Sequence, residues 1–177
     1  MTSSRDTVLN PEVTKWQNAR VHTVMEGSHA GTGLRIGIVC GKFNGGITTR
    51  LLTSSLDVLL ASGVNAKDVV IAWVPGAFEV PIAAKRFAQS GFDAVITLGA
   101  VIRGDTGHYD VVAGECARGV QDVQIETGVP VVFGVLTTNT IDQALERSLP
   151  DATNKGRESA ETALEMVSVL KGIASLS

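Results

Sequence analysis

The segment IRGDTGHYD at residues 102–110 carries the side chains best suited to chemistry. Gly104 and Gly107 free its backbone, and amides that precede a helix N-terminus can form a cradle for an anion such as phosphate. Thr106 adds a hydroxyl donor, and His108 can transfer protons near neutral pH. The alternative is that Gly-Asp-Thr-Gly is a plain turn and His108 a helix cap. The segment therefore predicts a phosphate site beside a proton-transfer residue.

Two further segments could hold an organic ligand. Phe43 and Asn44 follow a predicted strand, and a flat ring beside an amide suits a heteroaromatic molecule. Glu79 stands at a predicted helix start, where the helix dipole keeps a carboxylate ionised and able to accept hydrogen bonds from hydroxyls. The simpler alternatives are a buried structural ring at Phe43 and a plain N-terminal charge at Glu79.

Other reactive side chains are open to two interpretations each. Arg147 and Lys155 flank the segment LPDATN and could pair with an anion from a neighbouring edge, although solvated surface charges are commoner. Cys40 ends a predicted strand, and with Glu79 and His108 it could form a thiol triad. The sequence lacks the spacing of small thiol phosphatases, so a buried inert thiol is the favoured interpretation of Cys40.

Alternating strands and helices must position these residues. Apolar β-rich runs predict buried strands at 34–40, 69–74, 93–99 and 129–137. Helical spacing and helix-start patterns predict helices at 47–63, at 78–91, after the loop at 102–109, from a capping box at Thr140, and at 157–171. This alternation predicts a flavodoxin-like, three-layer α/β/α sandwich around a four-stranded parallel sheet. Ligands of such folds bind outside the carboxyl ends of the strands, where CGKFNGG, VPGAFE, GAVIRGDTGH and FGVLTTN lie.

Length and composition fit this architecture. The 177 residues, 44% hydrophobic and 19% charged, suffice for a single domain at 18–177 preceded by a polar, flexible arm at 1–17. A net charge of −3 argues against a nucleic-acid partner, and the absence of a long apolar run argues against a membrane partner. GKFNGG lacks the end of a P-loop, so a nucleotide cofactor is not supported. The two cysteines match neither a disulfide framework nor a zinc site, and a soluble intracellular protein is expected.

The chain resembles the 6,7-dimethyl-8-ribityllumazine synthase family over about residues 31–172, through GKFN (41–44), WVPGAFEVP (73–81), LGAVIRGDTGHYD (98–110), VPVVFGVLTTNTIDQALER (129–147) and NKG (154–156). The resemblance implies condensation of 5-amino-6-(D-ribitylamino)uracil with 3,4-dihydroxy-2-butanone 4-phosphate. This transferase step of riboflavin biosynthesis releases water and phosphate without a metal or other cofactor. A cytoplasmic enzyme is implied, with plastid import left open.

The resemblance also implies roles for individual residues. His108 would transfer protons in Schiff-base formation and phosphate loss, with entropy saved by the fixed pose of the substrates. Three of the binding residues, Phe133, Arg147 and Lys155, match positions that approach the site from an adjacent subunit. The implied ligands of the butanone phosphate are Gly104, Asp105, Thr106 and Arg147, and those of the ribitylaminouracil are Phe43, Asn44, Ala77, Phe78, Glu79, Ala100, Val101, Ile102, Phe133 and Lys155.

Assembly is the last property that the resemblance implies. Members of the family form pentamers, some of which pack into decamers or hollow 60-subunit capsids, and a functional link to riboflavin synthase is expected. Residues 19–24 would add a strand to a neighbour's sheet. The segment SLPDATNKG replaces the glycine-rich turn of capsid formers, and together with the long N-terminal arm it favours a pentamer.

Overall fold

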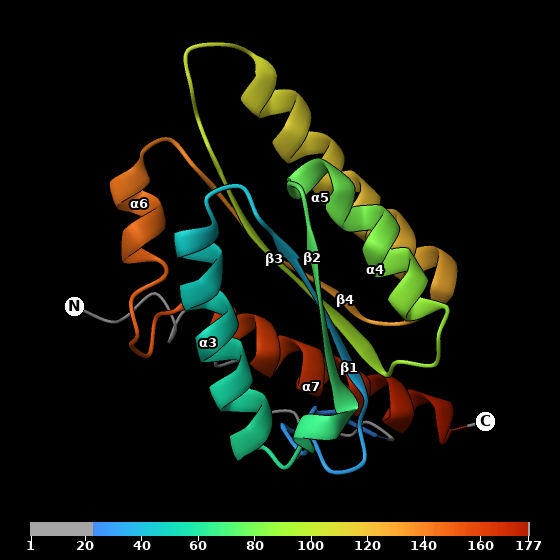
Figure 1. The fold of residues 1–177 in the computed structure, drawn as a ribbon. Helices are drawn as coiled ribbons and strands as arrows, with labels where there is room; N and C mark the ends of the chain where they lie inside the picture. The colour runs from blue at the N-terminus through green and yellow to red at the C-terminus, as the bar shows by residue number, and fades with distance from the viewer. Residues whose placement is uncertain (1–22, 177) are drawn as a thin grey trace.

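A computed structural model describes residues 23–176 of the chain (Figure 1). Within these residues four parallel strands form one sheet in the order β2-β1-β3-β4. The strands are β1 (Ile36–Gly41), β2 (Val69–Val74), β3 (Ala94–Ile102) and β4 (Val131–Thr138). The four predicted strands are confirmed. β3 continues three residues beyond its predicted end, because β4 pairs with it as far as Ile102.

Helices cover both faces of the sheet, as predicted (Figure 1). On one face lie α3 (Gly45–Ala61) and α7 (Lys155–Ala174), and on the other lie α4 (Val80–Ala88) and α5 (His108–Thr127). α6 (Ile141–Glu146) follows β4, and two short 3-10 helices, η1 (Ala66–Asp68) and η2 (Ala77–Glu79), flank β2. The described residues therefore form the expected three-layer, flavodoxin-like sandwich.

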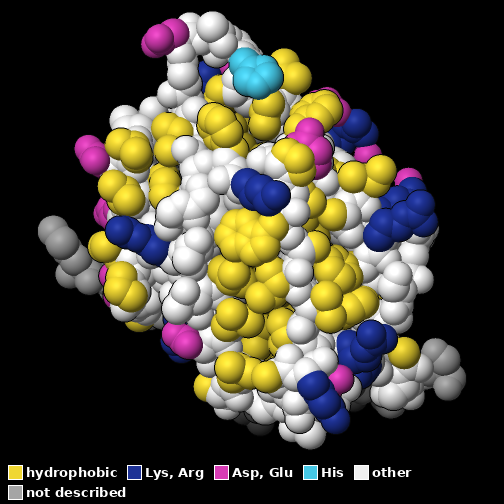
Figure 2. All heavy atoms as spheres, in the orientation of Figure 1, with side chains coloured by type: hydrophobic (Ala, Val, Ile, Leu, Met, Phe, Trp, Pro, Cys, Tyr) yellow, Lys and Arg dark blue, Asp and Glu magenta, His cyan; other side chains and the backbone are white. Residues whose placement is uncertain are grey.

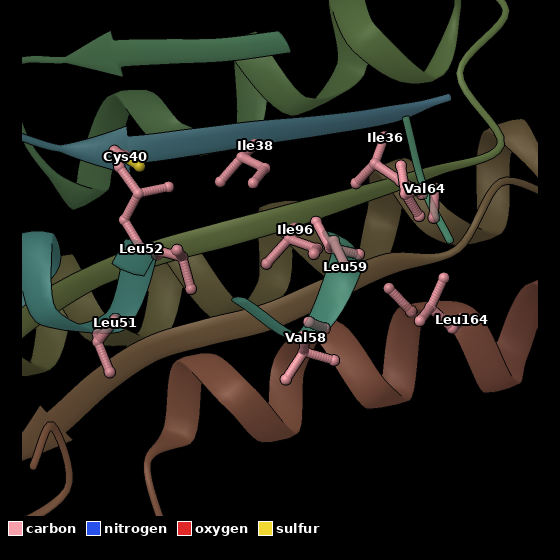
Figure 3. Packing of buried hydrophobic residues seen from close by; sticks show 14 of the residues in the cluster. Ile36, Ile38, Cys40, Leu51, Leu52, Val58, Leu59, Val64, Ile96 and Leu164 are labelled. Atoms are coloured by element: carbon pink, nitrogen blue, oxygen red, sulfur yellow. The ribbon is translucent and has the colours of Figure 1, made fainter. Parts of the chain in front are cut away.

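The sheet separates two apolar clusters, because paired residues of parallel strands direct their side chains to the same face. Ile38 pairs with Ile96, and both are fully buried beneath α3 and α7 together with Leu59 and Leu164. Figure 3 shows side chains from β1, β3, α3 and α7 converging in this cluster. The opposite cluster, under α4 and α5, includes Val39, Val80, Ala84, Val95, Cys116, Val120 and Val135.

Local capping fixes the ends of several helices. The capping box at α6 is confirmed, since the Thr140 side chain accepts from the Gln143 amide and the Gln143 side chain accepts from the Thr140 amide. α7 begins at Lys155, two residues before its predicted start, because the buried Asn154 side chain accepts hydrogen bonds from the amides of Gly156 and Arg157. Asn154 thus joins the segment after α6 to the start of α7.

Gly156 is required by the close approach of α7 to α3. A Cβ at this position would overlap the backbone of Leu51, and the Gly156 carbonyl accepts a buried hydrogen bond of 2.7 Å from Ser55. We expect Gly156→Ala to lower the free energy of unfolding by about 1–3 kcal/mol through overpacking. Thermal unfolding followed by circular dichroism measures this loss as a lower Tm.

Gly114→Ala is the matched control, because Gly114 lies within α5 and a Cβ there meets open space. Alanine favours the helix, so this variant should gain about 0.5–1 kcal/mol. Equal Tm values for the two variants would contradict the assigned packing.

Two predictions about the N-terminus fall wholly or mainly outside the described residues. The arm at 1–17 lies outside them, as do residues 19–22 of the predicted strand at 19–24. Thr23 and Val24 have no regular secondary structure. Among the described helices, none combines the length and apolar character that a membrane span requires.

The β2 edge of the sheet carries exposed apolar side chains. Ile71 and Trp73 face the α3 side, where they remain 38% and 41% exposed, and Val70 is exposed on the opposite face. Figure 2 shows hydrophobic side chains gathered over β2 in the middle of the visible face. An uncovered apolar edge strand is a surface on which another strand or chain can pack.

Candidate active site

A cleft of about 760 Å³ opens at the carboxyl ends of β1, β2 and β3. Three of the four segments predicted to form the site meet there. The fourth, FGVLTTN, does not line it. The lining consists of Phe43, Asn44, Pro75, Gly76, Ala77, Phe78, Glu79, Ala100, Val101, Ile102, Gly104, Thr106, His108, Tyr109, Val111 and Val112. Pro75, Gly76 and Tyr109 fall within the predicted segments VPGAFE and IRGDTGHYD but were not singled out as ligand contacts. Val111 and Val112 were missed, because an aliphatic side chain carries no chemical signal of its own.

Phe43 presents an open aromatic face to this cleft. Its backbone is held by a hydrogen bond of 3.2 Å from its amide to the Pro75 carbonyl, while its side chain is 75% exposed. The alternative of a buried structural ring is therefore wrong. Asn44 adopts a left-handed backbone conformation (φ 58°) and donates from Nδ2 to the Ala100 carbonyl at 2.9 Å. This bond joins the turn after β1 to β3 and fixes the place of the ring.

The backbone of β3 offers hydrogen-bonding groups to the cleft. β1 pairs with β3 only as far as Leu98, so beyond that residue the β1 side of β3 has no strand partner. Alternate residues of a strand direct their amide and carbonyl groups to opposite sides. Since the Ala100 carbonyl faces Asn44 and the Arg103 amide bonds to the Thr138 carbonyl, Ala100 and Ile102 direct their backbone groups toward the cleft.

Glu79 stands where a carboxylate can meet a ligand. It lies at the junction of η2 and α4, and its side chain makes no capping hydrogen bond to the first turn of α4. Oε2 lies 3.4 Å from the position of a Cβ on Gly76, so a larger residue there would crowd the carboxylate. Ala77 is buried beneath this turn, whereas Phe78 remains exposed at the rim.

The loop of residues 104–107 leads directly into α5. Gly107 occupies the N-cap position and offers no side chain to cap the helix. The His108 amide makes a hydrogen bond of 3.4 Å to Thr106 Oγ1, and the Asp110 amide makes one of 3.1 Å to the Gly107 carbonyl. The start of α5 still presents the positive end of its helix dipole, which favours an anion. Gly104 and Gly107 both border open space. His108 is the first residue of α5 and is exposed in the cleft, which makes its interpretation as a helix cap wrong. Asp105 is exposed but does not line the cleft.

Three further predicted residues lie in a different place. Phe133, Arg147 and Lys155 line a groove of about 670 Å³ that crosses the β4 edge between α5 and α7. Arg147 donates to the Gln143 carbonyl at 3.0 Å, and Lys155 pairs with Glu158 at 2.6 Å. One chain therefore carries two separate groups of predicted site residues, one in the cleft and one in the groove.

Cys40 does not belong to either group. It is fully buried in the cluster beneath α3, and burial raises the pKa of its thiol to about 12. A thiol with this pKa is protonated at neutral pH and cannot act as a nucleophile. The favoured interpretation of an inert thiol is confirmed, and the proposed thiol triad is wrong. Among the described residues, no cluster of histidine, cysteine or acidic side chains could hold a metal ion.

The parallel sheet, its two helical layers and the cleft at the carboxyl ends of its strands define a flavodoxin-like α/β protein with a small-molecule site. A family model for 6,7-dimethyl-8-ribityllumazine synthase matches residues 33–171. The chain belongs to this family, and its function is that of a lumazine synthase, a transferase of riboflavin biosynthesis that acts on small-molecule substrates.

Proposed function

We propose that the cleft condenses 5-amino-6-(D-ribitylamino)uracil with 3,4-dihydroxy-2-butanone 4-phosphate. The observation that carries this proposal is the convergence of an exposed ring, a carboxylate, open strand backbone and a helix N-terminus within one cleft. These groups match the parts of the two substrates, which are a heteroaromatic ring, a polyhydroxyl chain and a phosphate ester.

The ring and the ribityl chain occupy the half of the cleft formed by the ends of β1 and β2 and the free edge of β3. The pyrimidine stacks on Phe43, whose exposed face supports this role. The polar edge of the pyrimidine forms hydrogen bonds with the backbone groups of Ala100 and Ile102. The Glu79 carboxylate accepts hydrogen bonds from ribityl hydroxyls. Asn44 acts indirectly, because its amide is bound to the Ala100 carbonyl and keeps Phe43 opposite the β3 backbone.

The phosphate ester occupies the other half, at the start of α5. Backbone amides of the 104–107 loop and the positive end of the α5 dipole bind its oxygens, with Thr106 as a hydroxyl donor. His108 then lies beside the reacting carbons. It takes a proton from the attacking amine, returns one to the departing water, and assists the proton removal that accompanies phosphate loss. Holding both substrates in one pose lowers the entropic part of the barrier.

The groove completes the site of a neighbouring subunit. The groove holds three residues that stand apart from the cleft of their own chain, namely Arg147, Lys155 and Phe133. Arg147 could bind a phosphate, Lys155 adds a second positive charge, and Phe133 supplies an aromatic ring. A closed ring of five chains, with each groove placed over the next cleft, would bring the two groups together. The exposed β2 edge supports the addition of residues 19–24 from a neighbour as a further strand.

Turnover of the two substrates tests the chemistry. Lumazine absorbance and phosphate release are followed together, against an uncatalysed control. We expect both signals to rise in parallel at a rate well above the control. Binding of the pyrimidine without either signal would instead indicate a ligand carrier or cage. Light scattering tests the assembly, and a particle smaller than five subunits would contradict the shared site.

A further inference from the structure

Arg103 forms the densest set of side-chain interactions near the cleft, although it does not line the cleft itself. It follows directly after β3, and its amide extends the β3–β4 ladder by donating to the Thr138 carbonyl at 2.9 Å. Its guanidinium donates twice to Asp110, from Nη1 at 3.2 Å and from Nη2 at 2.9 Å. Nε donates to Asn139 Oδ1 at 3.1 Å, and the guanidinium lies 4.1 Å from the centre of the Tyr109 ring.

These contacts enclose the loop that carries the proposed phosphate cradle. The backbone of Arg103 anchors the N-terminal end of the loop to the sheet, while its side chain holds Tyr109 and Asp110, the two residues directly after His108. Between these points the loop contains Gly104 and Gly107, both beside open space, and its side-chain contact is a long hydrogen bond of 3.4 Å from the His108 amide to Thr106 Oγ1. Glycine has the greatest backbone freedom of any residue, and a loop of this kind needs an external constraint to hold one geometry.

We propose that Arg103 is a positioning residue that clamps the 104–107 loop and His108 through its double hydrogen bond to Asp110. This inference rests on the proposed function of the cleft. The bond closes the loop from the residue directly after β3 to the first turn of α5, and the bond to Asn139 ties the same guanidinium to the segment after β4. The planar fork of arginine allows all these contacts at once, which a lysine ammonium cannot reproduce.

Two observations separate this role from its alternatives. A stabilising role does not account for the pair, because the side chains of Arg103 and Asp110 are 42% and 62% exposed, and exposed ion pairs add little to stability. A direct phosphate ligand would line the cleft and keep its donors free, whereas three donors of Arg103 are already engaged outside it.

The test compares Arg103→Gln, Asp110→Asn and the double variant in the assembled protein. We expect each single change to lower kcat by roughly tenfold or more, because a slightly misplaced proton-transfer group and cradle slow the reaction strongly. KM for the pyrimidine should stay nearly constant. The double variant should be no slower than the worse single variant, since both changes remove one interaction. Arg103→Lys should recover only part of the rate.

Arg118→Gln is the matched control, since Arg118 also bonds two carboxylates on α5, those of Glu115 and Asp122, but lies outside the cleft lining. Its kcat should match the unmodified chain. If Asp110→Asn left kcat unchanged while Arg103→Gln raised KM for the butanone phosphate alone, Arg103 would be a phosphate ligand and the proposal would fail.

Amide hydrogen exchange tests the Arg103 clamp independently of the catalytic function proposed for the cleft. Peptides covering residues 103–110 should exchange faster in Arg103→Gln and in Asp110→Asn than in the unmodified chain and in Arg118→Gln. This readout requires no turnover, so an inactive unmodified chain would contradict the function alone. Unchanged exchange in both variants would overturn the clamp, whatever the activity.

Discussion

His108→Ala is expected to lose most of its turnover and to keep its affinity for the ribitylaminouracil. The imidazole stands at the start of α5 within the cleft, beside the loop that would hold the phosphate ester. A positioned proton-transfer group contributes about 10²–10⁴-fold to rate, so kcat should fall by that factor. The groups assigned to the ribitylaminouracil, Phe43 and Glu79, belong to other segments and are unaffected. Steady-state kinetics gives kcat, and a binding titration with the pyrimidine gives Kd.

His29→Ala supplies the matched control for the loss of a histidine. His29 is half-exposed, lies 3.9 Å from Glu165 on α7, and is absent from the cleft lining. Its removal should leave both kcat and Kd unchanged. A His108→Ala enzyme that works within twofold of the unmodified chain would remove the proton-transfer role. A large rise in Kd would show instead that His108 binds the pyrimidine.

The architecture was predictable because its signals are local. Buried parallel strands appear as continuous apolar runs, and Thr140 with Gln143 shows a capping box within four residues. One place where the prediction stopped short depends on a distant partner. β3 continues to Ile102 because β4 pairs with it there, which the residues around Ile102 do not reveal. α7 starts early because Asn154 caps it, and this cap is a local signal that the apolar spacing at 157–171 did not include.

The site was only partly predictable for the same physical reason. Residues at the carboxyl ends of adjacent strands meet by topology, which brought Phe43, Glu79 and His108 into one cleft. Topology does not say which residues of an edge strand face outward, and Phe133 lies in the groove beyond the β4 edge. Arg103 was missed because an arginine after a strand has no distinctive pattern until Tyr109, Asp110 and Asn139 are placed around it.

Separation of the cleft and the groove leads to the second large expected effect, which is complementation between two defective chains. Arg147→Ala should lower kcat/KM for the butanone phosphate by about 10–100-fold, because a charged hydrogen bond to the phosphate is lost. His108→Ala should lose most of its turnover for the reason given above. An Arg147→Ala chain keeps an intact cleft, and a His108→Ala chain keeps an intact groove. If each site combines one chain's cleft with its neighbour's groove, these two parts together contain every group that the reaction needs.

Mixed assemblies of the two variants should therefore recover activity that neither has alone. In a random ring of equal numbers, about a quarter of the interfaces join an intact cleft to an intact groove. The variants are dissociated, mixed and reassembled, and turnover is measured at a butanone phosphate concentration well below the KM of Arg147→Ala. The recovered rate should approach a quarter of that of the unmodified chain. Reassembly of each variant by itself gives the baseline.

Pairing His108→Ala with Phe43→Ala is the decisive control, because both residues lie in the same cleft. In that mixture every cleft lacks either the ring or the imidazole, whichever neighbour it meets. No recovery is expected, although the mixing and the number of substitutions are the same. Recovery in both mixtures would mean that refolding alone restores activity. Recovery in neither would mean that Arg147 serves the cleft of its own chain, which would require α6 to move from its place beside β4. Recovery in the first mixture alone is the result that a site shared between subunits predicts.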